Sequence, residues 1–286
     1  MLEIAPQVFI ERDYPGVTLG LIHWSMGVIL IDAPFRPDDI RQWRISMQTF
    51  SGSTDRLLIS LDDHYDRTLG SRQIECTVIG HDKLAQCLKD RPVNLRPQGL
   101  ETGAEWEMHN SLGNIRWSSP EITFTDHMEI HWERNILLLD AKPGPSPAAI
   151  WATLPVEKLI FVGDAVMPEA VPFLGSADLD QWMNALSDLL KPEFRSYQII
   201  SGRDGLLGQA EVKAQLKVLE KIAKQLEKFN AQPLRNEDIQ KAASHILKDC
   251  AVPKAKELQN LQRARYGIAQ YLRRTTGAQL EQPSAF

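Results

Sequence analysis

The order of strand-like and helix-like segments is the feature that most limits what this chain can fold into. Short runs of β-branched and aliphatic residues predict strands, and apolar residues spaced three or four apart predict helices. Strands are predicted as a hairpin in 17–32 and at 56–60, 77–80, 121–125, 128–132, 136–141, 149–154, 158–163 and 197–200, with helices at 38–50, 82–88 and 180–190. From Gln209 onward three amphipathic helical patterns follow one another. The sequence therefore predicts an α/β fold that ends in a helical extension.

Composition narrows the class of protein. The chain has 286 residues, 43% of them hydrophobic, and a formal net charge of -5 with no concentrated basic tract. This content suffices for a sizeable core, and the charge argues against nucleic acid as a partner. The N-terminus lacks the pattern of a signal peptide and no apolar stretch is long enough to cross a bilayer, so we expect a cytoplasmic protein without a membrane partner. The three cysteines have unrelated spacings and predict neither a disulfide framework nor a thiolate zinc site.

The segment Ser60–Arg67, with the sequence SLDDHYDR, sets acidic and imidazole groups at alternate positions directly after a predicted strand. Its Asp62, His64 and Asp66 could together bind a divalent cation. Two carboxylates and one imidazole favour harder ions such as Mn²⁺, Fe²⁺ or Mg²⁺ over Zn²⁺. Surface loops are also rich in aspartate, so a structural role for this segment stays open.

A second acidic residue follows another apolar strand. Leu159–Gly163 predicts a buried strand, and Asp164 comes immediately after it. In α/β proteins, sites form outside the carboxyl ends of strands. The alternative is that the Asp164 carboxylate only caps the following turn.

Taken in order, these segments resemble the metallo-β-lactamase superfamily. The resemblance runs over residues 8–208 and rests on the following segments: ILIDAP, SLDDHYDR, AKPGPSPAAIWATLPVEKLIFVGDAV and YQIISGRDG. It implies a four-layered αββα sandwich with a dinuclear metal site at one edge of the paired sheets. The chain is accordingly expected to consist of a domain of this type at 1–208 and a helical extension at 209–286 packed on it. In related hydrolases such an extension shapes the mouth of the site.

The resemblance implies an altered metal site. In the first metal motif of the superfamily, His64 and Asp66 are kept and Asp62 replaces the first histidine. A second ligand histidine is replaced by Pro145, which has no side-chain donor atom for a metal. The bridging aspartate is kept as Asp164. The last ligand histidine is replaced by Arg203, whose guanidinium stays protonated and does not bind metals.

Two interpretations of this altered site remain open. In the first, Asp62, His64, Asp66 and Asp164, helped by Asp204 after a small backbone shift, hold one Zn, Mn or Fe ion. Asp66 would then orient a water molecule for attack on a small ester, thioester or lactone.

In the second interpretation, Arg203 replaces the metal charge by pairing with Asp66 and Asp164. Converging carboxylates need a nearby positive charge, and Arg67 and Arg203 are both placed to supply it. The protein would then be a catalytically inactive, metal-free pseudoenzyme. It would bind a small anionic ligand through Arg67, Arg203 and Asp204, or bind a protein partner. The helical extension would form a pocket wall or the contact of a homodimer.

Overall fold

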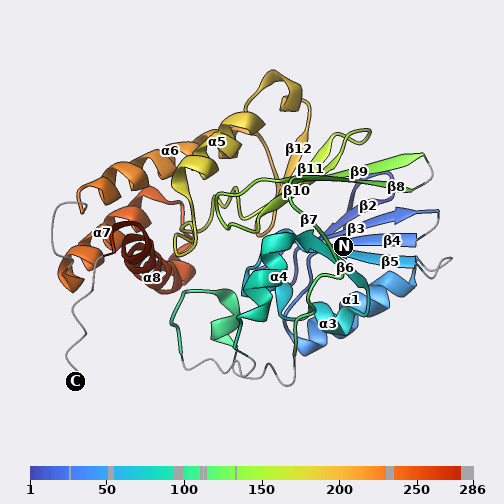
Figure 1. Cartoon of the computed structure of the whole chain (residues 1–286), viewed down its shortest axis with the longest axis horizontal. Coiled ribbons are helices and arrows are strands. Elements are labelled where there is room, and N and C mark those ends of the chain that lie inside the picture. Colours follow the sequence, from blue (N-terminus) through green and yellow to red (C-terminus); the bar gives the residue numbers. More distant parts are fainter. Residues whose placement is uncertain are drawn as a thin grey trace.

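Two β-sheets lie face to face at the centre of the molecule, with helices on the outer side of each (Figure 1). The structure is a computed structural model that describes residues 1–25, 27–50, 55–92, 99–109, 112, 115–132, 134–229 and 235–277. Met26, in the predicted hairpin turn, lies outside the described residues. The predicted four-layered α/β sandwich with a C-terminal helical extension is confirmed.

The first sheet has seven strands in sequential order. They are β1 (Leu2–Ala5), β2 (Val8–Glu11), β3 (Leu19–Trp24), β4 (Gly27–Ile31), β5 (Asp55–Ile59), β6 (Thr77–His81) and β7 (Ile122–Phe124). Pairing is antiparallel from β1 to β4 and parallel from β4 to β7. Every residue of β4 is buried, because β4 has a neighbouring strand on each side and other layers cover both of its faces.

The second sheet has six strands in the order β13-β12-β11-β10-β9-β8. They are β8 (His127–Trp132), β9 (Asn135–Ala141), β10 (Ile150–Leu154), β11 (Leu159–Gly163), β12 (Gln198–Ser201) and β13 (Gly205–Leu207). Only β11 and β12 pair in parallel. The edge strand β8 alternates exposed and half-buried residues, as expected of a strand with one solvated face.

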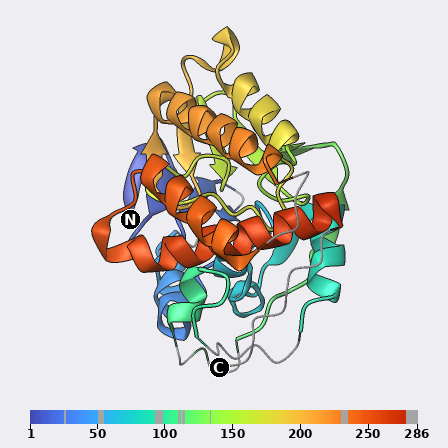
Figure 2. The same cartoon turned by 90° about the vertical axis from the view of Figure 1, so that its left-hand side faces the viewer.

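Helices cover the outer faces of both sheets. The first sheet carries α1 (Pro37–Gln48), α2 (Tyr65–Thr68), α3 (Ser71–Ile74) and α4 (Asp82–Lys89), and the 3₁₀ helix η1 (Glu105–Met108) follows them in the chain. The rest of the chain contains α5 (Leu179–Leu189), η2 (Pro192–Phe194), α6 (Gln209–Glu227), α7 (Asn236–Asp249), η3 (Lys254–Lys256) and α8 (Glu257–Thr276). Figure 2 shows α6, α7 and α8 together on one side of the molecule.

Separate apolar clusters hold these layers together. One lies between the two sheets and includes Ile29 and Phe161. Another lies outside the first sheet and includes Trp43 of α1. A third joins β10 and β11 to α5, α6, α7 and α8, so the helical extension packs on the second sheet. No helix in the described parts of the chain is both long and apolar enough to cross a membrane.

Several short elements were not predicted from the sequence. The strands β1, β2 and β13 and the helices α2 and α3 have only three or four residues each, too few to display a period. The helix α2 changes the interpretation of the 60–67 segment. The Nδ1 atom of His64 caps this helix by accepting the N–H of Asp66, so Asp62, His64 and Asp66 do not alternate along an extended strand.

Candidate functional site

The predicted site residues meet at the carboxyl ends of three strands. Asp62 and His64 follow β5, Asp164 follows β11, and Arg203 follows β12. The parallel neighbours β11 and β12 bring Asp164 and Arg203 to the same edge of the second sheet. Arg67 reaches them from α2, on the side of the first sheet. The site therefore forms where the carboxyl ends of strands from the two sheets meet.

Arg67 is at the centre of this arrangement and is completely buried. Its Nη1 atom lies 3.3 Å from Asp32 Oδ2, its Nε atom lies 3.1 Å from Asp62 Oδ1, and Nη2 forms an ion pair with Asp164 Oδ1. Gly202 is required beside it, because a Cβ atom at position 202 would collide with the guanidinium. One arginine thus holds three buried carboxylates together.

Asp32 is a member of the network that was not predicted from the sequence. It is fully buried at the end of β4 and has a left-handed backbone conformation, with φ of 60°. Besides contacting Arg67, it accepts the N–H of Leu61 at 2.9 Å. A sequence signal was present, since Asp32 follows an apolar strand directly, as Asp164 does.

Arg203 bridges the remaining groups of the site. Its Nε and Nη2 atoms each donate to one oxygen of Asp164 at 3.0 Å, which is a bidentate pair. Its Nη1 donates to Asp66 Oδ2 at 2.9 Å and to the carbonyl of Gly16 at 3.0 Å. Its Nη2 also lies 3.1 Å from Nδ1 of His64. The guanidinium therefore occupies the point where Asp66, Asp164 and His64 converge.

The protonation state of His64 follows from its neighbours. Within hydrogen-bond distance, Nδ1 meets two groups that can only donate, the N–H of Asp66 at 3.2 Å and Nη2 of Arg203 at 3.1 Å. The carboxylate oxygen Oδ2 of Asp66 lies farther away, at 3.6 Å. Nδ1 must therefore accept, which leaves the proton of the neutral ring on Nε2. Burial, together with the charge of Arg203, lowers the pKa of His64 to about 3. His64 is thus a neutral imidazole with an Nε2–H donor.

The carboxylates differ in how well their charges are compensated. Burial raises the pKa of Asp62 to about 7 and that of Asp32 to about 6, although Arg67 acts in the opposite direction. For Asp164, Arg203 and Arg67 outweigh burial and lower the pKa. The pKa of Asp66 is also lowered, because the charge of Arg203, its hydrogen bond and the N–H of Trp106 outweigh burial.

These residues do not fit a divalent metal ion in this arrangement. The Nδ1 lone pair of His64 is already used, and Asp66 accepts the N–H groups of Glu105 and Trp106 at 3.1 and 2.8 Å as well as Arg203. Both oxygens of Asp164 face arginine nitrogens. Within the described residues, no group of three or more histidine, cysteine, aspartate or glutamate side chains could hold a metal.

Two predicted positions lie apart from this network. The backbone N–H of Asp204 donates to Ser201 Oγ at 3.2 Å, and burial raises the pKa of its carboxyl group. Pro145 is buried next to Ser146, whose hydroxyl donates to Asp63. Neither residue has a contact with Arg203 among the described hydrogen bonds and ion pairs.

A cavity of about 330 Å³ opens beside His64. Its lining includes Tyr65 of α2, Phe173, and both Arg263 and Tyr266 of α8. The centre of the Phe173 ring lies 4.2 Å from the centre of the His64 ring. The guanidinium carbons of Arg263 and Arg203 lie 4.0 and 4.8 Å from the centre of the Phe173 ring. The arrangement offers cationic and aromatic groups to a small molecule. Arg263 was not predicted, because its helical segment resembles any solvated basic helix.

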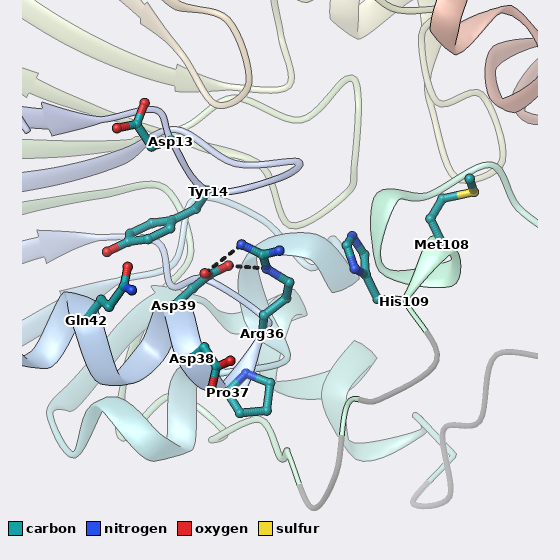
Figure 3. A pocket seen from close by; sticks show the side chains of 9 residues that line it. All are labelled: Asp13, Tyr14, Arg36, Pro37, Asp38, Asp39, Gln42, Met108 and His109. Carbon is teal, nitrogen blue, oxygen red and sulfur yellow. Dashed lines mark hydrogen bonds and ion pairs between the residues drawn. The ribbon is translucent and has the colours of Figure 1, made fainter.

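A larger cavity of about 800 Å³ lies near the start of α1 and is lined by Tyr14, Arg36, Asp39 and His109, among others (Figure 3). Its lining contains none of the predicted site residues. The guanidinium of Arg36 is engaged by both oxygens of Asp39, at 2.5 and 2.7 Å. This pair also anchors the first turn of α1, so its charges already have a structural role. The candidate site is therefore the smaller cavity, beside His64.

The sequence model of the metallo-beta-lactamase superfamily matches residues 73–197. This segment contains Pro145 and Asp164 but neither the 60–67 motif nor Arg203. No curated protein matches the sequence at a significant level.

Solved structures match over most of the chain. The stereoselective inverting sec-alkylsulfatase from Pseudomonas sp. has a TM-score of 0.71 and 12% identity, and the match covers 96% of this chain and 50% of the alkylsulfatase. The chain thus spans half of that enzyme's length. A metallo-beta-lactamase family protein from Thermus thermophilus has a TM-score of 0.64 and 15% identity over 95% of each chain. The metallo-beta-lactamase from Pontibacter korlensis has a TM-score of 0.59 and 16% identity over 77% of this chain and 97% of its own.

Proposed function

We propose that this chain is a metal-independent protein of the metallo-β-lactamase superfamily that binds a small anionic ligand. The premise is that the chain has the metallo-β-lactamase fold and matches the superfamily over residues 73–197. The observation that carries the proposal is the position of Arg203. Its guanidinium donates to Asp164 and Asp66 and contacts His64, three groups that would otherwise be metal ligands. A protein cation takes the place of a metal charge.

Electrostatics supports this arrangement. Four carboxylates, those of Asp32, Asp62, Asp66 and Asp164, are buried around Arg67 and Arg203. A buried ion network is stable only if its charges are compensated. Here both arginines contact carboxylates through every guanidinium nitrogen, although Nε of Arg67 meets Asp62 at ion-pair distance without a hydrogen bond. A divalent ion at this place would have to displace Arg203 and leave its guanidinium buried without its partners, which is costly.

The competing proposal is a hydrolase of small esters, thioesters or lactones with one Zn, Mn or Fe ion. It requires Asp66 to orient a water molecule. Three hydrogen bonds from Glu105, Trp106 and Arg203 already engage both oxygens of Asp66. Asp66 is therefore better suited to positioning Arg203 and η1 than to acting as a catalytic base.

The ligand would bind in the cavity beside His64. All three nitrogens of Arg67 face carboxylates, so the ligand-binding role predicted for Arg67 becomes one of positioning Asp164. Arg203 does not line the cavity but adds its positive charge nearby, 4.8 Å from the centre of the Phe173 ring. The cytoplasmic location, the homodimer and the ligand-binding role of Asp204 stay predictions from the sequence.

Metal analysis tests the proposal directly. We expect protein purified without chelator to contain Zn, Mn and Fe far below one equivalent, as measured by mass spectrometry. Arg203→His should restore a ligand and raise Zn²⁺ affinity at least about tenfold in calorimetric titrations. Arg195→His, at an exposed position, is the matched control and should leave Zn²⁺ affinity unchanged. One equivalent of metal in the wild-type protein, lost in Asp164→Ala, would overturn the proposal.

A further inference from the structure

Arg263 of α8 is a buried cation that has no carboxylate partner within the part of the chain that the structure describes. It is 3% exposed. Its Nε and Nη2 atoms donate to the carbonyl of Gly103 at 3.1 and 2.7 Å, and Nη1 lies 3.4 Å from the carbonyl of Val171. Among the described residues, no carboxylate oxygen lies within ion-pair distance of its guanidinium. Arg67 and Arg203, by contrast, each contact at least two carboxylates.

A buried charge normally has a partner, because removal from water is costly when nothing replaces the lost solvation. Neutral carbonyl groups satisfy some N–H donors of Arg263 but do not compensate its charge. Burial and the neighbouring Arg203 lower the pKa of Arg263 to about 9, although the more distant carboxylates of Asp66, Asp164 and Glu105 act in the opposite direction. The positive charge of Arg263 is thus available to an anion from outside the chain.

The cavity beside His64 is where such an anion can reach Arg263. Arg263 and His64 both line it. Because Nδ1 of His64 accepts from Arg203 and Asp66, the Nε2–H of His64 is a donor. This Nε2–H has no hydrogen-bond partner among the described residues. Two residues of the cavity lining therefore carry donor groups, and one of them, Arg263, carries a full charge.

The other walls of the cavity indicate the body of the ligand. Tyr65, Phe173 and Tyr266 supply aromatic surface. A volume of about 330 Å³ is at the lower end of the range for small-molecule sites. Asp63 also lines the cavity, and its carboxylate disfavours a second negative charge on the ligand.

We propose that this cavity binds a small monocarboxylate with a flat apolar body, its carboxylate held by the guanidinium of Arg263 and the Nε2–H of His64. This inference rests on the proposed function and names its ligand class. A planar carboxylate matches the fork of an arginine, and the aromatic lining of Tyr65, Phe173 and Tyr266 suits an apolar body. No bond is made or broken in this step.

Binding of matched acids and amides tests the inference. The probes are benzoate, phenylacetate and 3-phenylpropionate, each compared with its primary amide by calorimetry in buffer that contains a chelator. We expect at least one acid to bind the wild-type protein about tenfold or more tightly than its amide, because only the acid forms a charge-assisted pair. Equal binding of acid and amide, or no binding by any acid, would overturn the inference.

Variants on α8 locate the binding. Arg263→Met should abolish the preference for the acid, whereas Arg265→Met, at an exposed position of the same helix, should retain it. Retention of the preference in a folded Arg263→Met protein would contradict the inference. If Arg263→Met does not fold, Gln270→Trp provides a second test, because its indole fills the cavity. Unchanged acid binding in Gln270→Trp would also overturn the inference.

The two proposals fail in different ways. If the acids bind to a metal ion, chelator abolishes their binding and Arg263→Met does not affect it, and the proposed function fails. If acids bind in chelator with no dependence on Arg263, only the ligand assignment fails.

Discussion

At the scale of single residues, three arginines decide the chemistry of the candidate site. Arg67 compensates Asp32, Asp62 and Asp164, and Arg203 occupies the point where Asp66, Asp164 and His64 converge. Both guanidinium groups are held by ion pairs. Arg263, the third, has no ion pair among the described residues and contacts two carbonyl groups and the Phe173 ring. The site thus separates two arginines held by ion pairs from a third that would pair with the inferred carboxylate ligand.

Removal of Arg67 should destabilise the protein strongly. Arg67→Met leaves three buried carboxylates without their shared cation, so we expect a loss of about 3–5 kcal/mol in the free energy of unfolding. Urea denaturation measures this loss. The control is Arg41→Met, which removes an exposed ion pair with Asp38, both side chains being 75% exposed. The Arg41→Met substitution should lower the free energy of unfolding by no more than about 1 kcal/mol. Equal effects of the two substitutions would show that the buried network contributes little to stability.

At the scale of elements, the site depends on the contact between the 101–104 loop and α8. Glu107 of η1 holds this loop by accepting the N–H groups of Thr102 and Gly103, each at 2.9 Å, and the hydroxyl of Thr102 at 2.6 Å. The loop in turn presents the Gly103 carbonyl to Arg263. This chain of contacts connects η1 to the far end of the sequence and positions the guanidinium beside the cavity.

Gly103→Ala should disturb this contact. Gly103 has φ of 77°, and a Cβ atom there would lie 2.6 Å from the backbone nitrogen of Arg263. Since a backbone atom cannot move aside cheaply, we expect a loss of more than about 2 kcal/mol in the free energy of unfolding, together with weaker binding of the acid probes.

Gly277→Ala is the matched control for this prediction. Gly277 also has a left-handed backbone, with φ of 67°, but a Cβ atom there would meet no atom of the described residues within 4 Å. The Gly277→Ala protein should lose only about 1 kcal/mol in the free energy of unfolding, which is the cost of the left-handed conformation. Equal losses for the two substitutions would mean that close packing of the loop on α8 is unimportant.

At the scale of the whole molecule, the helical extension shares an apolar cluster with the second sheet. This cluster contains Trp151 and Val162 of the sheet and Trp182 of α5, together with buried residues of α6, α7 and α8. The extension also supplies Arg263 and Tyr266 to the cavity. Stability and the candidate site both depend on the same docking of helices onto the sandwich.

Truncation after residue 208 tests this dependence. We expect the shortened chain to lose cooperative thermal unfolding and to bind a hydrophobic dye, because removal of α6, α7 and α8 exposes the cluster that they cover. Near-ultraviolet circular dichroism and dye fluorescence measure the change. A truncated chain that unfolds cooperatively at the temperature of the full chain would show that residues 1–208 form an independent domain.

Much of the fold could be predicted from local pattern. The apolar runs of β4, β5, β6, β10 and β11 and the spacing of α1, α5 and α6 are strong signals, because each element buries a regular face. Shorter elements such as α2 lack a period, and their conformation is set by contacts with distant residues. For that reason the alternation of Asp62, His64 and Asp66 was not a guide to where their side chains point.

The sequence by itself determined the α/β sandwich and the helical extension, and its resemblance to the superfamily predicted that Asp62, Pro145 and Arg203 stand where metal-binding histidines would be. Only the tertiary structure decided what surrounds these residues. It brought Asp32 to Arg67, directed Arg203 at Nδ1 of His64, and placed Arg263 beside the same cavity. The physical reason is that burial and charge compensation depend on groups that are far apart along the chain and meet only when the sheets and helices pack.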